Sequence, residues 1–234
     1  MAAERAFFFM TEMHTMETNV VRYRLEELSA AIVDDHEVVL EGFKSYMVKN
    51  GMRLVETFKT ARKLLDYLQF QHFDVYIIDV ELPDMEASLL IDEIRRLDAQ
   101  ARIIINTMHE EMWVVRKMSE KKVDGVVYKS GDLGQLLEAV VCVGNGGQYY
   151  CTKFRQMSNR SDSQVGLLSK REVEVLQAIA RGLSTKAIAQ QLYISENTVE
   201  THRQNMFSKL KAHNMAELIV KAISCGYIDP KSIG

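Results

Sequence analysis

The sequence contains little proline, little cysteine and no long apolar run. Two prolines in 234 residues leave most of the chain uninterrupted, which favours a helix-rich architecture over a turn-rich all-β fold. Three unclustered cysteines support neither a disulfide framework nor a zinc site. The apolar runs are far shorter than the roughly 20 residues of a membrane helix, and the first residues lack a signal-peptide pattern. The sequence therefore predicts a cytoplasmic protein with no membrane partner.

The net charge of −3 hides a difference between two parts of the chain. Residues 1–164 hold twenty Lys and Arg against twenty-six Asp and Glu, a balance of −6. Residues 165–234 hold nine against six, a balance of +3. The total length favours two domains of roughly 150 residues or fewer. An acidic first part and a mildly basic second part indicate different partners for the two domains.

Short apolar runs alternate with helical patterns from about residue 30 to residue 143. Five such repeats predict an α/β doubly wound fold with a five-stranded parallel sheet. A polar stretch rich in small residues follows at 156–166 and indicates a linker, and the pattern from residue 167 is purely helical. We predict an N-terminal extension at 1–28, an α/β domain at 29–147, a linker at 148–166 and a second, smaller all-α domain at 167–234.

Carboxylates follow two of the predicted strands of this sheet. Asp34 and Asp35 end the first strand and Asp79 ends the third, so all three meet at the carboxyl edge, where functional sites of such sheets lie. Carboxylates without neighbouring thiols or imidazoles suit Mg²⁺. Thr107 and Lys129 end the fourth and fifth strands, and an ammonium beside a cation can neutralise a phosphoryl group. Asp79 is therefore a candidate nucleophile toward phosphorus.

The strand ends carry four short motifs: Ala31-Ile32-Val33-Asp34-Asp35-His36, Ile77-Ile78-Asp79-Val80-Glu81-Leu82-Pro83, Asn106-Thr107 and Tyr128-Lys129-Ser130. These motifs resemble the receiver domain of bacterial response regulators, a flavodoxin-like fold, over about residues 29–147. The resemblance implies that Asp79 accepts a phosphoryl group from a sensor histidine kinase. It further implies that Asp34 and Asp35 hold Mg²⁺ with Asp79, and that Thr107 and Lys129 respond to the phosphoryl group.

Two departures from the receiver pattern keep other readings open. Ala87 stands where receivers usually have glycine after the proline loop, and Val126 stands where they have an aromatic switch residue. An atypical receiver that phosphorylation does not switch is the main alternative. A Mg²⁺-dependent phosphohydrolase is a second, although such enzymes commonly need Asp-x-Asp, and this chain has Asp79-Val80-Glu81. We therefore predict that the chain is not an enzyme.

The second domain has the pattern of a helix-turn-helix. Ser169 and Glu172 form a capping box, and Ser184 and Ser195 cap two further helices. The last of these, Glu196–Leu210, has one apolar stripe and a polar outer face, as a helix that enters the major groove requires.

The sequence of this domain contains the motifs Leu168-Ser169-Lys170-Arg171-Glu172-Val173-Glu174-Val175-Leu176, Ile188-Ala189-Gln190-Gln191-Leu192 and Ile194-Ser195-Glu196-Asn197-Thr198-Val199-Glu200-Thr201-His202. These motifs resemble the LuxR-type helix-turn-helix over about residues 165–228, which makes the whole chain similar to the NarL/FixJ class of transcription regulators. The resemblance implies double-stranded DNA and a second copy of the chain as partners, with RNA polymerase as a further candidate. We assign phosphate contacts to Lys186, Asn197, Arg203 and Lys209, base contacts to Glu200, Thr201 and Gln204, and dimerisation to Met215, Leu218, Ile219 and Ala222.

Overall fold

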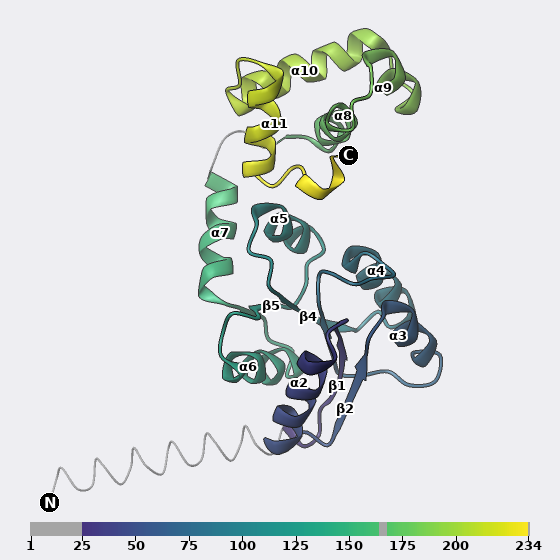
Figure 1. The fold of residues 1–234 in the computed structure, drawn as a ribbon, viewed down its shortest axis with the longest axis vertical. Helices are drawn as coiled ribbons and strands as arrows, with labels where there is room; N and C mark the ends of the chain where they lie inside the picture. Colours follow the sequence, from purple (N-terminus) through teal and green to yellow (C-terminus); the bar gives the residue numbers. More distant parts are fainter. Residues whose placement is uncertain (1–24, 164–167, 234) are drawn as a thin grey trace, which may run out of the picture. The chain divides into compact units, whose positions relative to one another are not determined.

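The structure, a computed structural model, describes residues 25–163 and 168–233. Contacts divide the chain into two compact units (Figure 1). Of the described residues, the first unit contains 25–109 and 121–151, and the second contains 110–120, 152–163 and 168–233. Each unit is described by itself below.

The first unit is built on a parallel sheet with strand order β2-β1-β3-β4-β5-β6. The strand order reverses between β1 and β3, which is the switch point of a doubly wound sheet, so the predicted fold class is confirmed. The strands are β1 (Ser29–Val33), β2 (Leu54–Phe58), β3 (Val75–Ile78), β4 (Arg102–Thr107), β5 (Gly125–Tyr128) and β6 (Tyr149–Tyr150).

Helices cover both faces of this sheet, because the central strands are buried on both sides. The helices α2 (Glu37–Lys49) and α6 (Leu133–Gly144) pack on one face, and α3 (Ala61–Tyr67) and α4 (Ala87–Leu97) lie together at the other (Figure 1). Residues alternate between the two faces along each strand: Ile32 and Ile77 join the core under α2 and α6.

The sheet corrects one sequence prediction. The predicted five strands are six, because Tyr149 and Tyr150 pair with Gly125 and Val126 at the edge. A strand of two residues is too short to leave a periodic pattern. The predicted N-terminal extension at 1–28 lies mostly outside the described residues, but the buried side chains of Leu25 and Leu28 belong to the core under α2 and α6.

The second unit contains four helices of the carboxyl-terminal domain: α8 (Lys170–Ala180), α9 (Thr185–Gln191), α10 (Glu196–Leu210) and α11 (Met215–Ser224), followed by the 3₁₀ turn η1 (Pro230–Ser232). The capping box at Ser169 and Glu172 is confirmed, with both reciprocal hydrogen bonds present. Val199, Met206 and Leu210 form the inward stripe of α10 and join the domain core. The predicted all-α domain is therefore present.

The segment predicted as a linker, 148–166, is largely structured where it is described. After β6 it forms α7 (Thr152–Ser163), in which no proline or glycine interrupts the helix and Phe154 is buried. The polar composition of this segment predicts a linker and gives no indication of the helix. The helix α5 (Met112–Glu120), which connects β4 to β5, groups with the second unit because it packs against α7 and α11. The predicted domain boundaries differ from the contact division at this helix.

Candidate functional site

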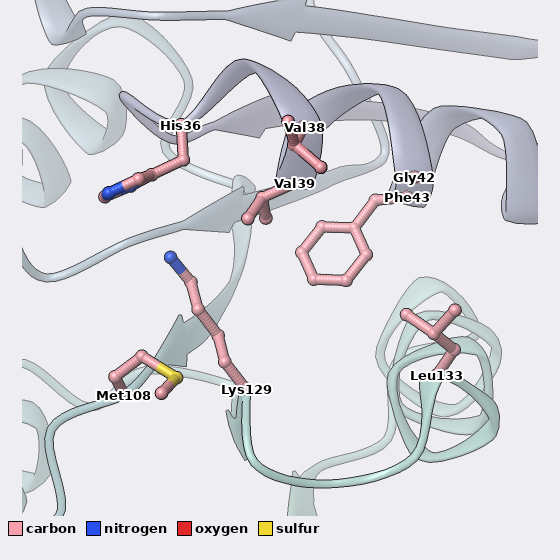
Figure 2. A pocket seen from close by; sticks show the side chains of 8 residues that line it. All are labelled: His36, Val38, Val39, Gly42, Phe43, Met108, Lys129 and Leu133. Carbon is pink, nitrogen blue, oxygen red and sulfur yellow. The ribbon is translucent and has the colours of Figure 1, made fainter.

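The predicted phosphoacceptor lies in a cluster at the carboxyl ends of β1, β3 and β5. Asp34 and Asp79 are buried, and the side chain of Lys129 is only 9% exposed. Lys129 Nζ lies 2.7 Å from Asp79 Oδ2 and 2.5 Å from Asp34 Oδ2. Figure 2 shows this lysine extending from the end of β5 toward His36 at the start of α2. The structure thus brings together three of the predicted site residues from three different strands.

Burial and the charges within the cluster shift two pKa values. Burial raises the pKa of the Asp79 carboxyl above its usual value, and the hydrogen bond from Lys129 offsets this only in part. Burial alone would lower the pKa of the Lys129 ammonium, but its hydrogen bonds to Asp34 and Asp79 outweigh that effect, and the pKa is raised. The lysine therefore stays charged, and holds a positive charge where a phosphoryl group on Asp79 would need it.

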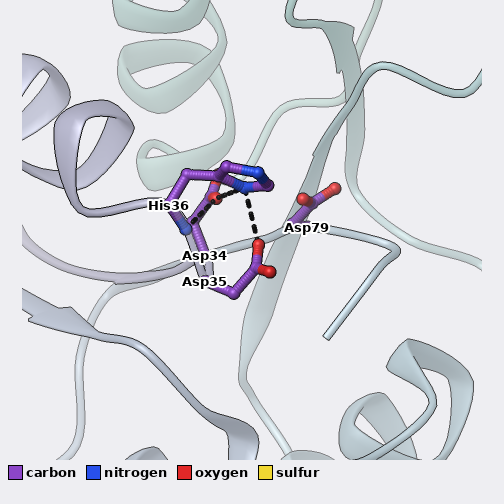
Figure 3. Close-up of side chains that lie close together, drawn as sticks. All are labelled: Asp34, Asp35, His36 and Asp79. Carbon is purple, nitrogen blue, oxygen red and sulfur yellow. Dashed lines mark hydrogen bonds and ion pairs between the residues drawn. The ribbon is translucent and has the colours of Figure 1, made fainter. Parts of the chain in front are cut away.

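A group of oxygen and nitrogen ligands lies beside Asp79. One ligand atom each from Asp34, Asp35, His36 and Asp79 falls within 4.8 Å of the others. The imidazole Nδ1 of His36 lies 2.6 Å from Asp35 Oδ1 and 3.2 Å from Asp34 Oδ1 (Figure 3). The sequence argument that the carboxylates have no neighbouring imidazole was therefore wrong, since His36 directly follows them. The carboxylates Asp34, Asp35 and Asp79 still fit a hard cation.

Thr107, the fourth predicted residue of the receiver site, ends β4 and is fully buried. Its hydroxyl accepts a hydrogen bond from the backbone N–H of His109 at 3.1 Å, and its carbonyl accepts one from the N–H of Lys129 at 2.8 Å. The His109 ring in turn lies 3.0 Å from Glu81 Oε2. The backbone of Thr107 thus connects the ends of β4 and β5.

The loop after Asp79 is fixed by a residue that sequence reasoning missed. Asp84 accepts hydrogen bonds from the backbone N–H groups of Ala61 and Arg62, at 3.0 and 2.9 Å, and so caps α3 from another loop. Ala87, where receivers usually have glycine, starts α4 and is not among the residues with positive φ. The loop therefore closes without a glycine at that position.

The helix-turn-helix residues lie on α9 and α10. Ser184 and Ser195 cap these helices, accepting from the N–H groups of Ala187 and Thr198 at 3.3 and 3.0 Å. Tyr193 in the turn between them has φ +54° and is 95% exposed. The side chains of Lys186, Asn197, Glu200, Thr201 and Gln204 are exposed, as DNA contacts require, and Arg203 is half-buried.

Two of the predicted DNA contacts are joined to each other and to α9. Glu200 Oε1 lies 3.3 Å from Arg203 Nη1 and 3.1 Å from the hydroxyl of Thr185. The hydroxyl of Thr201 donates to the carbonyl of Asn197 one turn earlier, at 2.9 Å. Its methyl group remains the part suited to a thymine methyl.

Lys209 occupies a different environment from the other predicted phosphate contacts. Its Nζ lies 2.7 Å from Oε2 of Glu172, whose side chain is 3% exposed. Burial alone would raise the pKa of the Glu172 carboxyl, but hydrogen bonds from Lys209 and Ser169 outweigh it, and the pKa is lowered. A phosphate contact by Lys209 would compete with this ion pair.

The residues predicted for dimerisation do not all lie on the surface of α11. Leu218 and Ala222 are fully buried in the domain core, so they cannot reach a second chain; the prediction failed to separate the core stripe from the outer face. Met215 and Ile219 are half-buried, and Val220 is 61% exposed. A dimer contact on this helix would use Val220, which sequence reasoning did not select.

Comparisons with known proteins agree with both parts of this arrangement. The family model "Response regulator receiver domain" matches residues 30–141, and the model "Bacterial regulatory proteins, luxR family" matches residues 166–222. The fold and the strand-end cluster thus define a response-regulator receiver joined to a helix-turn-helix. The chain therefore has a response-regulator receiver domain joined to a LuxR-type DNA-binding domain, and its relatives are transcription regulators of the NarL/FixJ type.

Relatives of similar length support this assignment. The Fimbriae Z protein of Salmonella typhimurium strain LT2 is 29% identical over 201 residues, covering 83% of this chain and 96% of the relative. The oxygen regulatory protein NreC of Staphylococcus carnosus is 28% identical, covering 86% and 100%. The fold matches the structure of the two-component response regulator RcsB–DNA complex with a TM-score of 0.61 and 24% identity, over 84% of this chain and 98% of that one. Within residues 25–163 and 168–233, no helix has the length and apolar character to cross a membrane.

Proposed function

We propose that a histidine kinase phosphorylates Asp79, and that the phosphoryl group controls dimerisation and sequence-specific DNA binding. The observation that carries this proposal is the buried Asp79 carboxylate, which lies 2.7 Å from the Lys129 ammonium and follows β3, the strand that pairs with β4. A phosphoryl group there would meet a fixed positive charge and would place new oxygens near Thr107. Phosphorylation would then shift the population of the chain between two conformations.

Mg²⁺ is the cofactor that we assign to this step. Asp34, Asp35 and Asp79 would hold it, and it would neutralise charge on the phosphoryl oxygens during transfer. The close grouping of their ligand atoms supports this assignment.

The partners follow from the second domain and from the relatives. RcsB, which shares the fold, is described in structures as dimers bound to DNA. We infer that this chain also binds double-stranded DNA as a homodimer in the cytoplasm, with α10 in the major groove. Lys186, Asn197 and Arg203 are assigned to phosphates, and Glu200, Thr201 and Gln204 to base edges. RNA polymerase is a further partner that this assignment suggests.

A gel-shift titration tests the phospho-switch. A DNA site would first be found by sequencing the genomic fragments that the purified chain retains. The chain should then bind this site more tightly with beryllofluoride and Mg²⁺ than without them, and Asp79→Asn should abolish the difference. Equal affinity in both states would instead favour a receiver that phosphorylation does not switch.

A further inference from the structure

Glu200 places a carboxylate on the helix that we assign to the major groove. It is the fifth residue of α10, and its side chain is 50% exposed. The N-terminal residues of a recognition helix are the ones that contact base edges. Because DNA phosphates repel a carboxylate, an acidic side chain at this position needs a nearby positive charge and a base that donates a hydrogen bond to it.

Arg203 supplies the positive charge. Its Nη1 lies 3.3 Å from Glu200 Oε1, three positions earlier on α10. The guanidinium group has further N–H groups, so its pair with Glu200 is compatible with the phosphate contact that we assign to it. The pair carries no net charge, and the surface of α10 can therefore approach DNA with a carboxylate on it.

Thr185, the first residue of α9, holds the same carboxylate from the neighbouring helix. Its half-buried side chain donates a hydrogen bond from the hydroxyl to Glu200 Oε1 at 3.1 Å, and accepts one from Arg203 Nη1 at 3.3 Å. In the part of the chain that the structure describes, no donor is bonded to the other oxygen, Oε2. A carboxylate held in this way loses little additional side-chain freedom when Oε2 accepts a hydrogen bond from a base.

The bases differ in what they offer a carboxylate in the major groove. Guanine and thymine present acceptors, and adenine presents a donor beside the N7 acceptor, whereas cytosine presents the N4 donor alone. We infer that Glu200 recognises a cytosine in each half-site, and that Thr185 and Arg203 are positioning residues that hold its carboxylate for this contact. The inference rests on the proposed function, since it requires α10 to lie in the major groove.

Selection of duplexes from a random pool tests this inference. The full chain, with beryllofluoride and Mg²⁺, should select cytosine about tenfold over the other bases at one position of each half-site. Glu200→Gln should change the selected base to adenine, and Glu200→Lys should change it to guanine, because these side chains pair with those bases. Glu196→Gln removes the same charge one turn earlier on α10 and should leave cytosine selected at this position.

Variants at Thr185 test the positioning role. Thr185→Val keeps the shape of the side chain but removes the hydroxyl, so the preference for cytosine should fall to about threefold through the loss of one hydrogen bond. The dependence of affinity on salt should not change, because no charge is lost. Thr185→Ser keeps the hydroxyl and should keep the full preference. Competition between duplexes that differ only at this base measures the preference of each variant.

The outcomes separate this inference from the proposed function. If Glu200 only joined α9 to α10, its variants would unfold at lower temperature but would select the same base, and the inference would be wrong while DNA binding stood. If Thr185→Val bound all duplexes more weakly yet kept the full preference for cytosine, the positioning role of the hydroxyl would be wrong. If the parent chain selected no sequence at all, the proposed DNA recognition would fail together with the inference.

Discussion

Lys129 Nζ lies 2.7 Å from Asp79 Oδ2, although 50 positions separate the two residues in the sequence. The same ammonium reaches Asp34, so one positive charge lies between two buried carboxylates. Burial raises the pKa of the Asp79 carboxyl, and this ammonium offsets the rise only in part.

Replacing the ammonium should destabilise the first unit. Lys129→Met leaves Asp34 and Asp79 without their shared counter-charge, and breaking a buried pair in this way costs about 3 kcal/mol. Urea unfolding at neutral pH, in the presence of a chelator, should show this loss. Lys63→Met, which removes an exposed lysine from α3, is the matched control and should change stability little. Equal effects of the two substitutions would contradict the role of the charge.

Removing the Asp79 carboxyl should have the opposite effect. The folded pKa of Asp79 is raised, so ionisation opposes folding, and the protonated form is the one the fold prefers. Asp79→Asn should therefore be more stable than the parent at pH 7, by on the order of 1 kcal/mol without metal. The advantage should shrink as the pH falls through the raised pKa and vanish below the ordinary aspartate pKa of about 3.9. Urea unfolding across this range measures it; a constant difference would refute the linkage.

The site was largely predictable from the sequence because parallel strands bring their carboxyl ends to one edge. Asp34, Asp79 and Lys129 each follow a buried strand and Thr107 ends one, so the strand pattern alone was enough to group them. Contacts that depend on tertiary packing left no such pattern. Asp84 caps a helix 23 positions earlier, which no spacing rule indicates.

In the helical domain, too, local features could be predicted from the sequence and tertiary contacts could not. The boundaries of α10 follow from the cap at Ser195 and from its apolar stripe, and these are local features. On α11 the apolar residues could serve the domain core or a second chain, and periodicity does not distinguish the two uses. The burial of Leu218 and Ala222 assigns them to the core. Likewise, a basic residue on a polar helix face predicts a phosphate contact at Lys209. Its ion-pair partner Glu172 lies 37 positions away, so the sequence does not reveal the pair.

The Lys209–Glu172 pair should make stability depend on acid pH. The folded pKa of Glu172 is lowered, so its contribution is present above the ordinary glutamate pKa of about 4.3 and is lost as the pH falls through the folded value. Glu172→Gln removes the charge that pairs with Lys209 but keeps an amide oxygen that can accept the capping-box hydrogen bond, and should cost about 2 kcal/mol at pH 7. Thermal unfolding should show the parent and the variant converging at low pH. Glu174→Gln, on the more exposed side of the same helix, is the control.

Two substitutions in the helix-turn-helix should separate positioning from base recognition. Lys186 is exposed on α9, and Lys186→Ala should weaken binding to all sequences alike and reduce the slope of log K against log salt by about 1 per protomer, because a phosphate contact is lost. Gln204→Ala should leave the slope unchanged and cost about 1–3 kcal/mol on the best site only. Lys170→Ala, at the start of α8, controls for the loss of one positive charge. Fluorescence anisotropy with specific and scrambled duplexes at several salt concentrations distinguishes the two effects. If Gln204→Ala weakened both duplexes equally, the outer face of α10 would not be the surface that recognises bases.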